Sequence, residues 1–417
     1  MGEIEELVLK TLKPTEEDEI KRKLALNNLK NLMKGLDIHV GGSFGKGTWL
    51  RGNADIDVYV YYPKALGKNE LRKRFFEDIN ERLKGIEYTV EYADNPFIVA
   101  NIDGIDFDIV PVFKVENPEE VISPADRIPF YTKYINEKLR ENEKDEARLI
   151  KAFMHGVGVY GSDARTKGFS GYAAELLTVK HKSFRKILED ASNWKPQVRI
   201  ELAKPKREFK DPLVIIDEVD PRRNVGASVS LQKLAIFSLA SRKYLEKPDI
   251  KFFFPPKGKD DEERVEGDLA IARLELEDDV NEDMLWGQVS SSINSIKKHL
   301  KVSGYKVIDV SAWGDKKEVN IGVQLESKEQ GKYYKVEGPY FYMKDEVDAF
   351  IKSNKNVWVN EDGRLCATRE RNVDAENIIK NSIKLKYKHK KNVEWYHNGE
   401  KVKGDVAKFI RKRPIWL

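Results

Sequence analysis

The fold of this chain is decided by two neighbouring stretches near its start, GGSFGKGTW at residues 41–49 and ADIDVYV at residues 54–60. The second stretch alternates polar and apolar side chains, as a half-buried strand does. On such a strand Asp55 and Asp57 lie on one face, and the apolar side chains between and after them face the core. The sequence therefore predicts two adjacent carboxylates just after a glycine-rich turn.

Two carboxylates this close repel each other and raise each other's pKa unless a divalent cation lies between them. Magnesium is the natural candidate, because it prefers oxygen ligands and commonly uses one or two carboxylates together with substrate phosphates. A third carboxylate is needed if two metal ions are to serve an in-line phosphoryl displacement. Residues 104–112, GIDFDIVPV, repeat the strand alternation, and Asp108 is the preferred third carboxylate. Without the earlier motif, this pattern would indicate only a solvated strand face.

The glycines of residues 41–47 permit backbone angles closed to other residues and let amide groups approach a ligand. Such a turn can hold a triphosphate, but it is not a Walker loop, because the G-x-x-x-x-G-K-[ST] spacing is absent. Taken alone, a glycine cluster is more often an ordinary tight turn. The order of the two motifs and the short gap from Ser43 to Asp55 favour nucleotide and metal chemistry.

These features resemble the nucleotidyltransferase superfamily that includes poly(A) polymerases, with its Gly-Ser pair, Asp-x-Asp and later strand aspartate. Five separated blocks narrow this resemblance: GSFGKGTWL at 42–50, DRIPF at 126–130, RLIK at 148–151, GFSGY at 168–172 and RRNV at 222–225. Together they resemble the archaeal class I CCA-adding tRNA nucleotidyltransferases. The match extends over roughly the first 250 residues and is looser beyond.

The resemblance implies an α+β multidomain protein with a polymerase β-like nucleotidyltransferase palm head, a helical neck, and a ferredoxin-like or RRM-like body with a basic tail. The expected divisions are a catalytic head at residues 1–125, a neck that binds base and triphosphate at 126–250, and an RNA-binding body and tail at 251–417. In the head we expect a helix capped by Thr15, with one apolar face made by Ile20, Leu24, Leu29 and Leu32.

The pattern of the third segment itself predicts the order strand, helix, strand, strand, helix, strand, which is the split ferredoxin-like order. Many RNA-binding modules share this fold, although fold alone does not give function. The expected elements are strands near 269–276, 307–313, 319–325 and 357–359, a helix containing Met284, Val289, Ile293, Ile296 and Leu300, and a short helix around 347–351.

Charge is unevenly distributed. The chain has a net charge of +4, yet residues 380–417 hold 12 Lys or Arg against 3 acidic residues, so the remaining 379 residues sum to −5. Such an asymmetry indicates a basic arm that meets a polyanion, and four interleaved aromatic residues are suited to stacking on bases. The alternative is a solubilising, partly buried terminal sheet. The four aromatic residues are Tyr387, Trp395, Tyr396 and Trp416.

Composition adds further limits. Hydrophobic content is 40%, and no apolar stretch approaches the ~18 residues of a membrane span. The acidic start does not resemble a signal peptide, and the single cysteine, Cys366, excludes an internal disulfide and a cysteine-rich zinc site. We therefore expect a cytoplasmic protein without membrane partners.

The resemblance also implies roles for single residues. Asp55, Asp57 and Asp108 would be catalytic and hold two Mg²⁺ ions. Contacts to the triphosphate map to Gly42, Ser43, Lys46, Tyr131, Lys151 and Tyr160, and contacts to the base map to Arg223 and Asn224. Three positions depart from many relatives: Lys46 replaces an arginine, Tyr131 replaces a histidine, and Asp55 replaces a glutamate found in some of them.

The implied activity is template-independent addition and repair of the 3′-terminal CCA of tRNA from CTP and ATP, with release of pyrophosphate. The tRNA would be recognised by the shape of its acceptor stem and T arm, and a homodimer is compatible with the resemblance. The alternatives are a poly(A) polymerase-type RNA 3′ nucleotidyltransferase, a catalytically inactive RNA-binding homologue, and a transferase that modifies small molecules. The last is disfavoured because it leaves the basic aromatic tail without a purpose.

Overall fold

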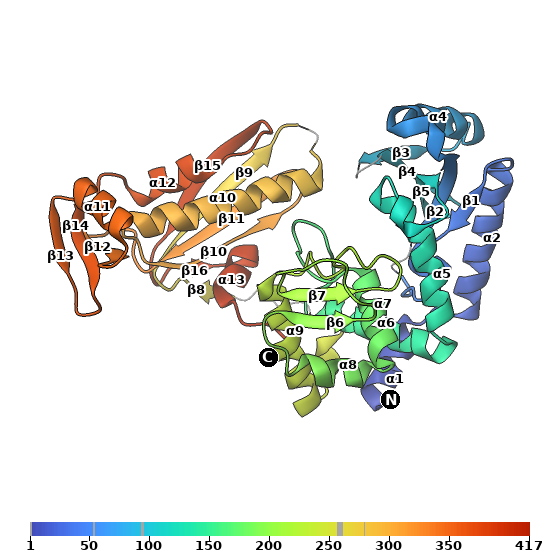
Figure 1. The fold of residues 1–417 in the computed structure, drawn as a ribbon, viewed down its shortest axis with the longest axis horizontal. Helices are drawn as coiled ribbons and strands as arrows, with labels where there is room; N and C mark the ends of the chain where they lie inside the picture. Colours follow the sequence, from blue (N-terminus) through green and yellow to red (C-terminus); the bar gives the residue numbers. More distant parts are fainter. Residues whose placement is uncertain (1, 53–54, 93–95, 257–261, 279) are drawn as a thin grey trace. The chain divides into compact units, whose positions relative to one another are not determined.

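The computed structural model describes residues 2–52, 55–92, 96–256, 262–278 and 280–417 of the chain (Figure 1). Two compact units make up the chain. Unit 1 comprises Met1–Pro256 together with Pro414–Leu417, and unit 2 comprises Lys257–Arg413. Across the described ranges, none of the helices combines the length and the apolar character that crossing a membrane requires.

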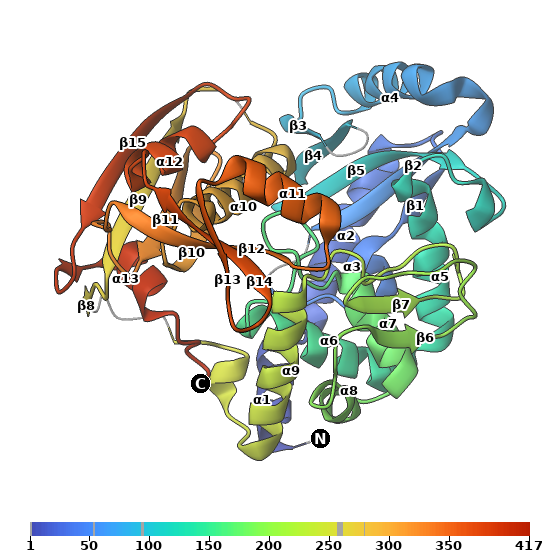
Figure 2. The ribbon, with the colours of Figure 1, turned by 60° about the vertical axis from the view of Figure 1, so that its left-hand side comes forward.

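Unit 1 opens with a five-stranded mixed sheet of order β1-β2-β5-β4-β3 (Figure 2). The central strands β2 and β5 are parallel, and the other neighbours are antiparallel. The predicted alternation is confirmed, because Ile56, Val58 and Val60 are fully buried in the sheet core. The strands are β1 Ile38–Val40, β2 Ile56–Pro63, β3 Tyr88–Tyr92, β4 Pro96–Ile102 and β5 Ile105–Lys114. Of these, β4 was not predicted.

Two helices, α2 (Glu16–Leu32) and α4 (Gly67–Arg82), pack into the core of this sheet. The predicted cap of α2 is confirmed, since the side chain of Thr15 accepts a hydrogen bond from the backbone N–H of Asp18. The predicted apolar face was wrong, because Ile20 and Leu24 are 53% and 60% exposed. Ile20 lies nine residues before the buried Leu29, which is about two and a half helical turns and therefore the opposite side. The buried residues of α2 are Ala25, Leu26 and Leu29.

The rest of unit 1 is mostly helical, as predicted. Its core surrounds Phe153, whose ring lies 5.5–6.1 Å from five other aromatic rings. A two-stranded parallel sheet, β6 (Val198–Glu201) and β7 (Leu213–Ile216), was not predicted. The helices are α1 Glu3–Leu12, α3 Gly42–Lys46, α5 Ile128–Lys138, α6 Glu141–Gly156, α7 Gly171–His181, α8 Phe184–Ala191 and α9 Leu231–Glu246.

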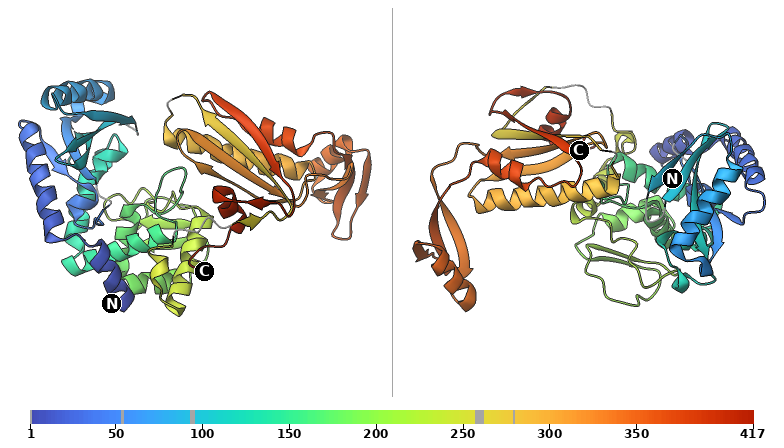
Figure 3. Two further views of the ribbon diagram at one scale, coloured as in Figure 1. Left: turned by 180° about the vertical axis from the view of Figure 1, so that it is seen from behind. Right: turned by 90° about the horizontal axis from the view of Figure 1, so that it is seen from above.

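Unit 2 contains a four-stranded antiparallel sheet of order β10-β11-β9-β15, with the long helix α10 along it (Figure 3). The chain order is strand, helix, strand, strand, helix, strand, so the predicted ferredoxin-like fold is confirmed. Met284 at the start of α10 is 54% exposed and does not belong to the buried face. The elements are β9 Asp268–Leu276, α10 Glu282–Val302, β10 Val307–Gly314, β11 Glu318–Leu325, α12 Ala375–Ser382 and β15 His389–Tyr396.

The sequence prediction was wrong about which second helix and which fourth strand complete this fold. The short helix α11 (Lys344–Ser353) and the strand β13 (Asn356–Val359) belong to a separate three-stranded sheet of order β12-β14-β13. Its other strands are β12 (Tyr333–Tyr340) and β14 (Arg364–Glu370). Strand β13 pairs with β14, its neighbour in the chain, whereas β9 takes β15 as its second neighbour. The small sheet is therefore an insertion between the third strand and second helix of the ferredoxin-like order.

The basic tail is folded. Strand β15 pairs with β9, β16 (Lys401–Val402) pairs with β8 (Glu263–Arg264), and Phe409 of α13 (Gly404–Arg411) stacks on Trp313 with ring centroids 5.5 Å apart. Trp416 is buried in unit 1 beside Phe252, so it does not present its ring for stacking on RNA. The alternative of a partly buried terminal sheet therefore describes most of the tail.

Candidate active site

The two parallel strands bring two of the predicted carboxylates together. In the register of β2 and β5, Asp57 lies directly opposite Asp108. The hydroxyl of Tyr59 donates a hydrogen bond to Oδ1 of Asp57 at 3.3 Å. Asp55 precedes the first residue of β2 and is exposed. Asp57 and Asp108 thus form the half-buried part of the predicted acidic site, and Asp55 is its exposed member.

The electrostatics of this pair favour a cation. Burial raises the pKa of Asp108, and the charges of Asp57 and Asp55 raise it further, to about 7. Burial also raises the pKa of Asp57, and the charge of Lys46 opposes that rise. Two oxygen donors that destabilise each other as anions fit a hard divalent cation. Within the described ranges, no three His, Cys, Asp or Glu side chains form a ready-made metal cluster, so ligation by all three aspartates stays a prediction.

The glycine-rich stretch lies beside the acidic pair. It forms the short helix α3, whose first residue, Gly42, lies close to the Asp57 carboxylate. Gly42 has φ +59°, and a Cβ at this position would lie 1.6 Å from Oδ2 of Asp57. A Cβ at Gly45 would lie 2.4 Å from the carbonyl oxygen of Val40. These glycines are therefore required because β1 and the Asp57 carboxylate approach the turn closely.

A cavity of about 510 Å³ opens beside this pair, a size typical of small-ligand sites. It is lined from the sheet, from α3 and α5, and from the loops before α7 and α9. The predicted site residues Asp57, Asp108, Gly42, Lys46, Tyr131 and Arg223 all line it. The other lining residues are Tyr59, Phe97, Val110, Pro124, Ala125, Ile128, Ser170, Tyr172 and Val225. Asp55, Ser43, Lys151, Tyr160 and Asn224 are not among the residues that line this cavity.

Lys46 and Lys151 meet at a buried carboxylate that the sequence did not predict. Nζ of Lys46 lies 2.6 Å from Oε2 of Glu175, and Nζ of Lys151 lies 2.7 Å from Oε1. Lys151 is 3% exposed, so its ammonium group is not a free charge at the surface. The missed signal was a glutamate next to Leu176 and Leu177 on a buried helix, where an ionised side chain is costly unless it is paired.

Arg223 is oriented by Tyr131. Nη1 of Arg223 donates a hydrogen bond to the hydroxyl of Tyr131 at 2.7 Å. The ring of Tyr131 stacks on Tyr172 with centroids 4.1 Å apart. Burial raises the pKa of Tyr131 to about 12, with Arg223 opposing the rise, so the hydroxyl stays protonated. In this structure Tyr131 therefore contacts the predicted base-binding arginine directly.

Two residues that were predicted to contact the nucleotide, Asn224 and Tyr160, do not line the 510 Å³ cavity. The amide of Asn224 accepts hydrogen bonds from the backbone N–H groups of Ile215 and Gly226 and donates to Asp211 and the carbonyl of Leu213. Its polar atoms thus hold the loop that carries Arg223. The ring of Tyr160 stacks on His155 with centroids 3.9 Å apart.

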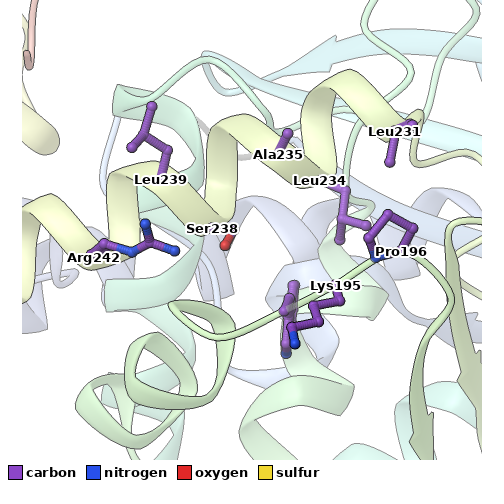
Figure 4. A pocket seen from close by; sticks show the side chains of 9 residues that line it. Lys195, Pro196, Leu231, Leu234, Ala235, Ser238, Leu239 and Arg242 are labelled. Carbon is purple, nitrogen blue, oxygen red and sulfur yellow. The ribbon is translucent and has the colours of Figure 1, made fainter.

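A second, smaller cavity of about 200 Å³ lies against α9 (Figure 4). The site residues predicted from the sequence are absent from its lining, and so are acidic side chains. It is lined by Trp194, Lys195, Pro196, Leu231, Leu234, Ala235, Ser238, Leu239 and Arg242. The 510 Å³ cavity, which joins carboxylates, cations and aromatic rings, is therefore the candidate active site.

Comparison with known proteins agrees with this geometry. Residues 22–131 match a nucleotidyltransferase domain, residues 145–254 the second domain of tRNA nucleotidyltransferases, and residues 270–401 the C-terminal domain of CCA-adding enzymes. The CCA-adding enzyme of Saccharolobus islandicus (strain Y.N.15.51) is 48% identical over 99% of this chain and 100% of its own length. This chain belongs to the CCA-adding enzyme family. The resemblance inferred from the five sequence blocks is thereby confirmed.

Other CCA-adding enzymes show the same extent of similarity. That of Saccharolobus solfataricus is 48% identical and that of Sulfurisphaera tokodaii 44% identical, each over 99% of this chain and over 100% and 99% of their own lengths. Among solved structures, a Cid1 poly(U) polymerase covers 60% of this chain and 96% of its own with 16% identity and a TM-score of 0.47, a likeness too weak to support a conclusion. The nucleotidyltransferase head, helical part and CCA-adding C-terminal domain follow from the family models.

Proposed function

We propose that this chain adds and repairs the 3′-terminal CCA of tRNA without a nucleic-acid template, using CTP and ATP and releasing pyrophosphate. The observation that carries the proposal is the single cavity in which Asp57 and Asp108 face Lys46, Tyr131 and Arg223, in a chain of the CCA-adding family. Carboxylates for a metal, a cation for phosphate and a donor-rich arginine for a base are the groups that nucleotidyl transfer requires.

Asp55, Asp57 and Asp108 are the residues that would hold Mg²⁺ ions. When bound, the ions supply a lowered pKa for the 3′-hydroxyl of the RNA and neutralise charge on the triphosphate. Asp108 is the carboxylate that would accept the proton of that hydroxyl.

The nucleotide is held from two sides in this proposal. Its triphosphate would meet Gly42, Ser43 and Lys46 on the head and Tyr131 and Tyr160 on the helical part, and Lys151 would serve it from behind Lys46. Its base meets Arg223, whose guanidinium offers donors to the acceptors of cytosine and adenine. We assign Asn224 to holding the Arg223 loop, on the basis of its hydrogen bonds to backbone groups.

We further propose the division into a head at residues 1–125, a neck at 126–250 and an RNA-binding body and tail at 251–417. The body and tail would contact the acceptor stem and T arm of tRNA through phosphates and 2′-hydroxyl groups. A cytoplasmic location and a homodimer are compatible with this proposal. Size-exclusion chromatography with light scattering tests for the homodimer.

An incorporation assay tests the function directly. A tRNA that lacks its terminal CCA is incubated with Mg²⁺ and with CTP and ATP, separately and together. We expect two additions with CTP alone and three with both nucleotides, followed by a stop. Continued addition of adenylate would instead indicate a poly(A) polymerase-type activity, and no addition would indicate a binding protein without catalysis.

The exposed lysines before and on β15 provide a test of tRNA binding. Deleting residues 380–417 is unsuitable, because it would remove a strand of the ferredoxin-like sheet. Charge reversal of Lys384, Lys386 and Lys390, which are all exposed, should weaken tRNA binding and reduce its salt dependence. The slope of log K against log salt should become shallower by up to ~0.9 for each phosphate that the variant no longer neutralises.

Filter binding between 50 and 300 mM KCl gives this slope. The matched control is reversal of three exposed lysines on unit 1, Lys10, Lys30 and Lys34, which alters net charge equally. An equal loss of affinity in both variants would show that the basic face of β15 has no specific role in tRNA binding.

A further inference from the structure

We propose that Glu175 is a positioning residue for the triphosphate site: its two carboxylate oxygens fix the ammonium groups of Lys46 and Lys151. The inference rests on the proposed function, because it takes these two lysines as the cations that serve the triphosphate. Glu175 lies on α7 and is fully buried, so it acts on the nucleotide through the lysines.

The geometry joins three elements at one carboxylate. Lys46 comes from α3, Lys151 from α6, and each ammonium group takes one oxygen of Glu175 at 2.6 and 2.7 Å. The hydroxyl of Thr48 donates a third hydrogen bond, to Oε1 at 2.5 Å. Charge-assisted hydrogen bonds of this kind are short and strong. Both oxygens of the carboxylate are therefore occupied by partners that point towards the triphosphate site or flank it.

The two lysines have different positions in this cluster. Lys46 lines the 510 Å³ cavity. Lys151 lies behind it, and its three N–H donors reach Oε1 of Glu175, Oγ1 of Thr48 at 2.8 Å and the Thr48 carbonyl at 3.3 Å. Two lysines and one carboxylate leave one net positive charge. Lys151 offsets the charge of Glu175, so that Lys46 presents a positive charge to the cavity.

The charge of Lys151 depends on its anion. Burial lowers the pKa of Lys151 to about 8, and Glu175 is the main group that opposes this fall. Burial alone would raise the pKa of Glu175, but the two lysines lower it to about 2, so it stays ionised. The charged and titratable groups around Lys151 are Glu175 on α7, Lys46 on α3, and Arg148 and His155 on its own helix α6.

Replacing the carboxylate by an amide therefore has a predictable effect. In Glu175→Gln, the amide oxygen accepts from one ammonium group, and the amide NH₂ faces the other and repels it. Without the anion, the pKa of Lys151 falls below its present value, and the cluster loses a proton in the neutral range. The affinity for a nucleoside triphosphate should then decline as pH rises, at a lower pH than in the wild type.

The test is calorimetric titration of the full-length chain with CTP and Mg²⁺, without RNA, at pH 6.0 and pH 7.5, both below the wild-type pKa of Lys151 of about 8. The measured quantity is the ratio of Kd between Glu175→Gln and wild type, which cancels the titration of CTP itself. We expect a ratio of about tenfold or more at pH 7.5 and less than about threefold at pH 6.0. In steady state, KM for CTP should rise more than kcat falls.

The matched control is Glu143→Gln. Glu143 is also a buried glutamate of unit 1 that pairs with Lys182 and Arg140, but neither of these cations lines the cavity. Its variant should show a ratio near one at both pH values. A ratio for Glu175→Gln that is near one, or equal at both pH values, would overturn the inference.

If circular dichroism shows that Glu175→Gln does not fold, Thr48→Val takes its place. That variant removes one donor to Glu175 and one acceptor for Lys151 at nearly constant volume, so the same pH trend is expected with a smaller ratio. Absence of that trend would overturn the inference equally. Failure of the proposed function is seen separately, because the wild-type preparation would then add no CMP or AMP to tRNA in the incorporation assay.

Discussion

Asp57→Ala is expected to abolish the incorporation of CMP and AMP while leaving tRNA affinity largely unchanged. Asp57 is the carboxylate that faces both Asp108 across the strand pair and the 510 Å³ cavity. Its removal takes away a central ligand of the proposed metal site, and metal stabilisation of the transition state is worth several kcal/mol. The rate of incorporation should therefore fall by about 1000-fold or more.

A second variant separates charge from packing. Asp57→Asn keeps the size of the side chain and removes its charge, which is one of the causes of the raised pKa of Asp108. In the absence of divalent cations, the pKa of Asp108 should move from about 7 back towards the ordinary range of an aspartate. The change can be followed by NMR of a selectively labelled sample.

The matched control for both variants is Asp106→Ala. Asp106 lies two residues before Asp108 on the same face of β5, but it is exposed and pairs with Asn101. Its loss should reduce incorporation only slightly. Near-normal incorporation by Asp57→Ala would refute the catalytic assignment, and an equal loss in Asp106→Ala would show that the general acidity of this strand face matters rather than one position.

The acidic pair was predictable because its signal is local. Strands alternate with a period of two, so the faces of residues 56–60 and 105–109 could be assigned from the sequence alone. That the two strands are neighbours followed only from the resemblance. The buried face of a helix is harder to assign from the sequence, because it depends on the phase of a 3.6-residue period. In α2 that phase was set by Ile20 and Leu24, and the small buried Ala25 that marks the true face was overlooked.

The sequence alone could not show which side chains far apart along the chain come together. Glu175 is 129 residues from Lys46 and 24 from Lys151, so the spacing of charges along the chain cannot reveal that the three meet. The same limit applies to unit 2, where β13 and β15 both follow a helix at a suitable distance. Of these two strands, β15 is the one that pairs with β9. Strands that pair across more than a hundred residues leave no local pattern in the sequence.

Gly42→Ala is expected to lose most of the activity of the enzyme, although residue 42 has no side chain. Alanine at φ +59° costs about 1–2 kcal/mol of stability in any left-handed position. In addition, its Cβ would lie 1.6 Å from Oδ2 of Asp57 and displace that carboxylate. A displacement of about 1 Å at a reacting centre can cost about 100-fold in rate.

Gly85→Ala is the control that isolates this displacement. Gly85 has φ +87°, and a Cβ there would have no heavy atom within 4 Å, so the backbone cost is matched without the clash. Thermal unfolding of both variants should show a larger loss of stability for Gly42→Ala. Activity should be near normal for Gly85→Ala and reduced about 100-fold or more for Gly42→Ala.

A double-mutant cycle then tests the cause. In the Asp57→Ala background the Oδ2 and Cγ atoms that the new methyl group would strike are gone, and the nearest remaining atom, the Cβ of residue 57, is 3.0 Å away. Gly42→Ala should therefore destabilise the Asp57→Ala variant much less than it destabilises the wild type. Additive losses of stability would mean that the glycine is needed for the path of the backbone alone. A strong coupling would mean that residue 42 is glycine because the carboxylate of Asp57 must occupy the space of a side chain.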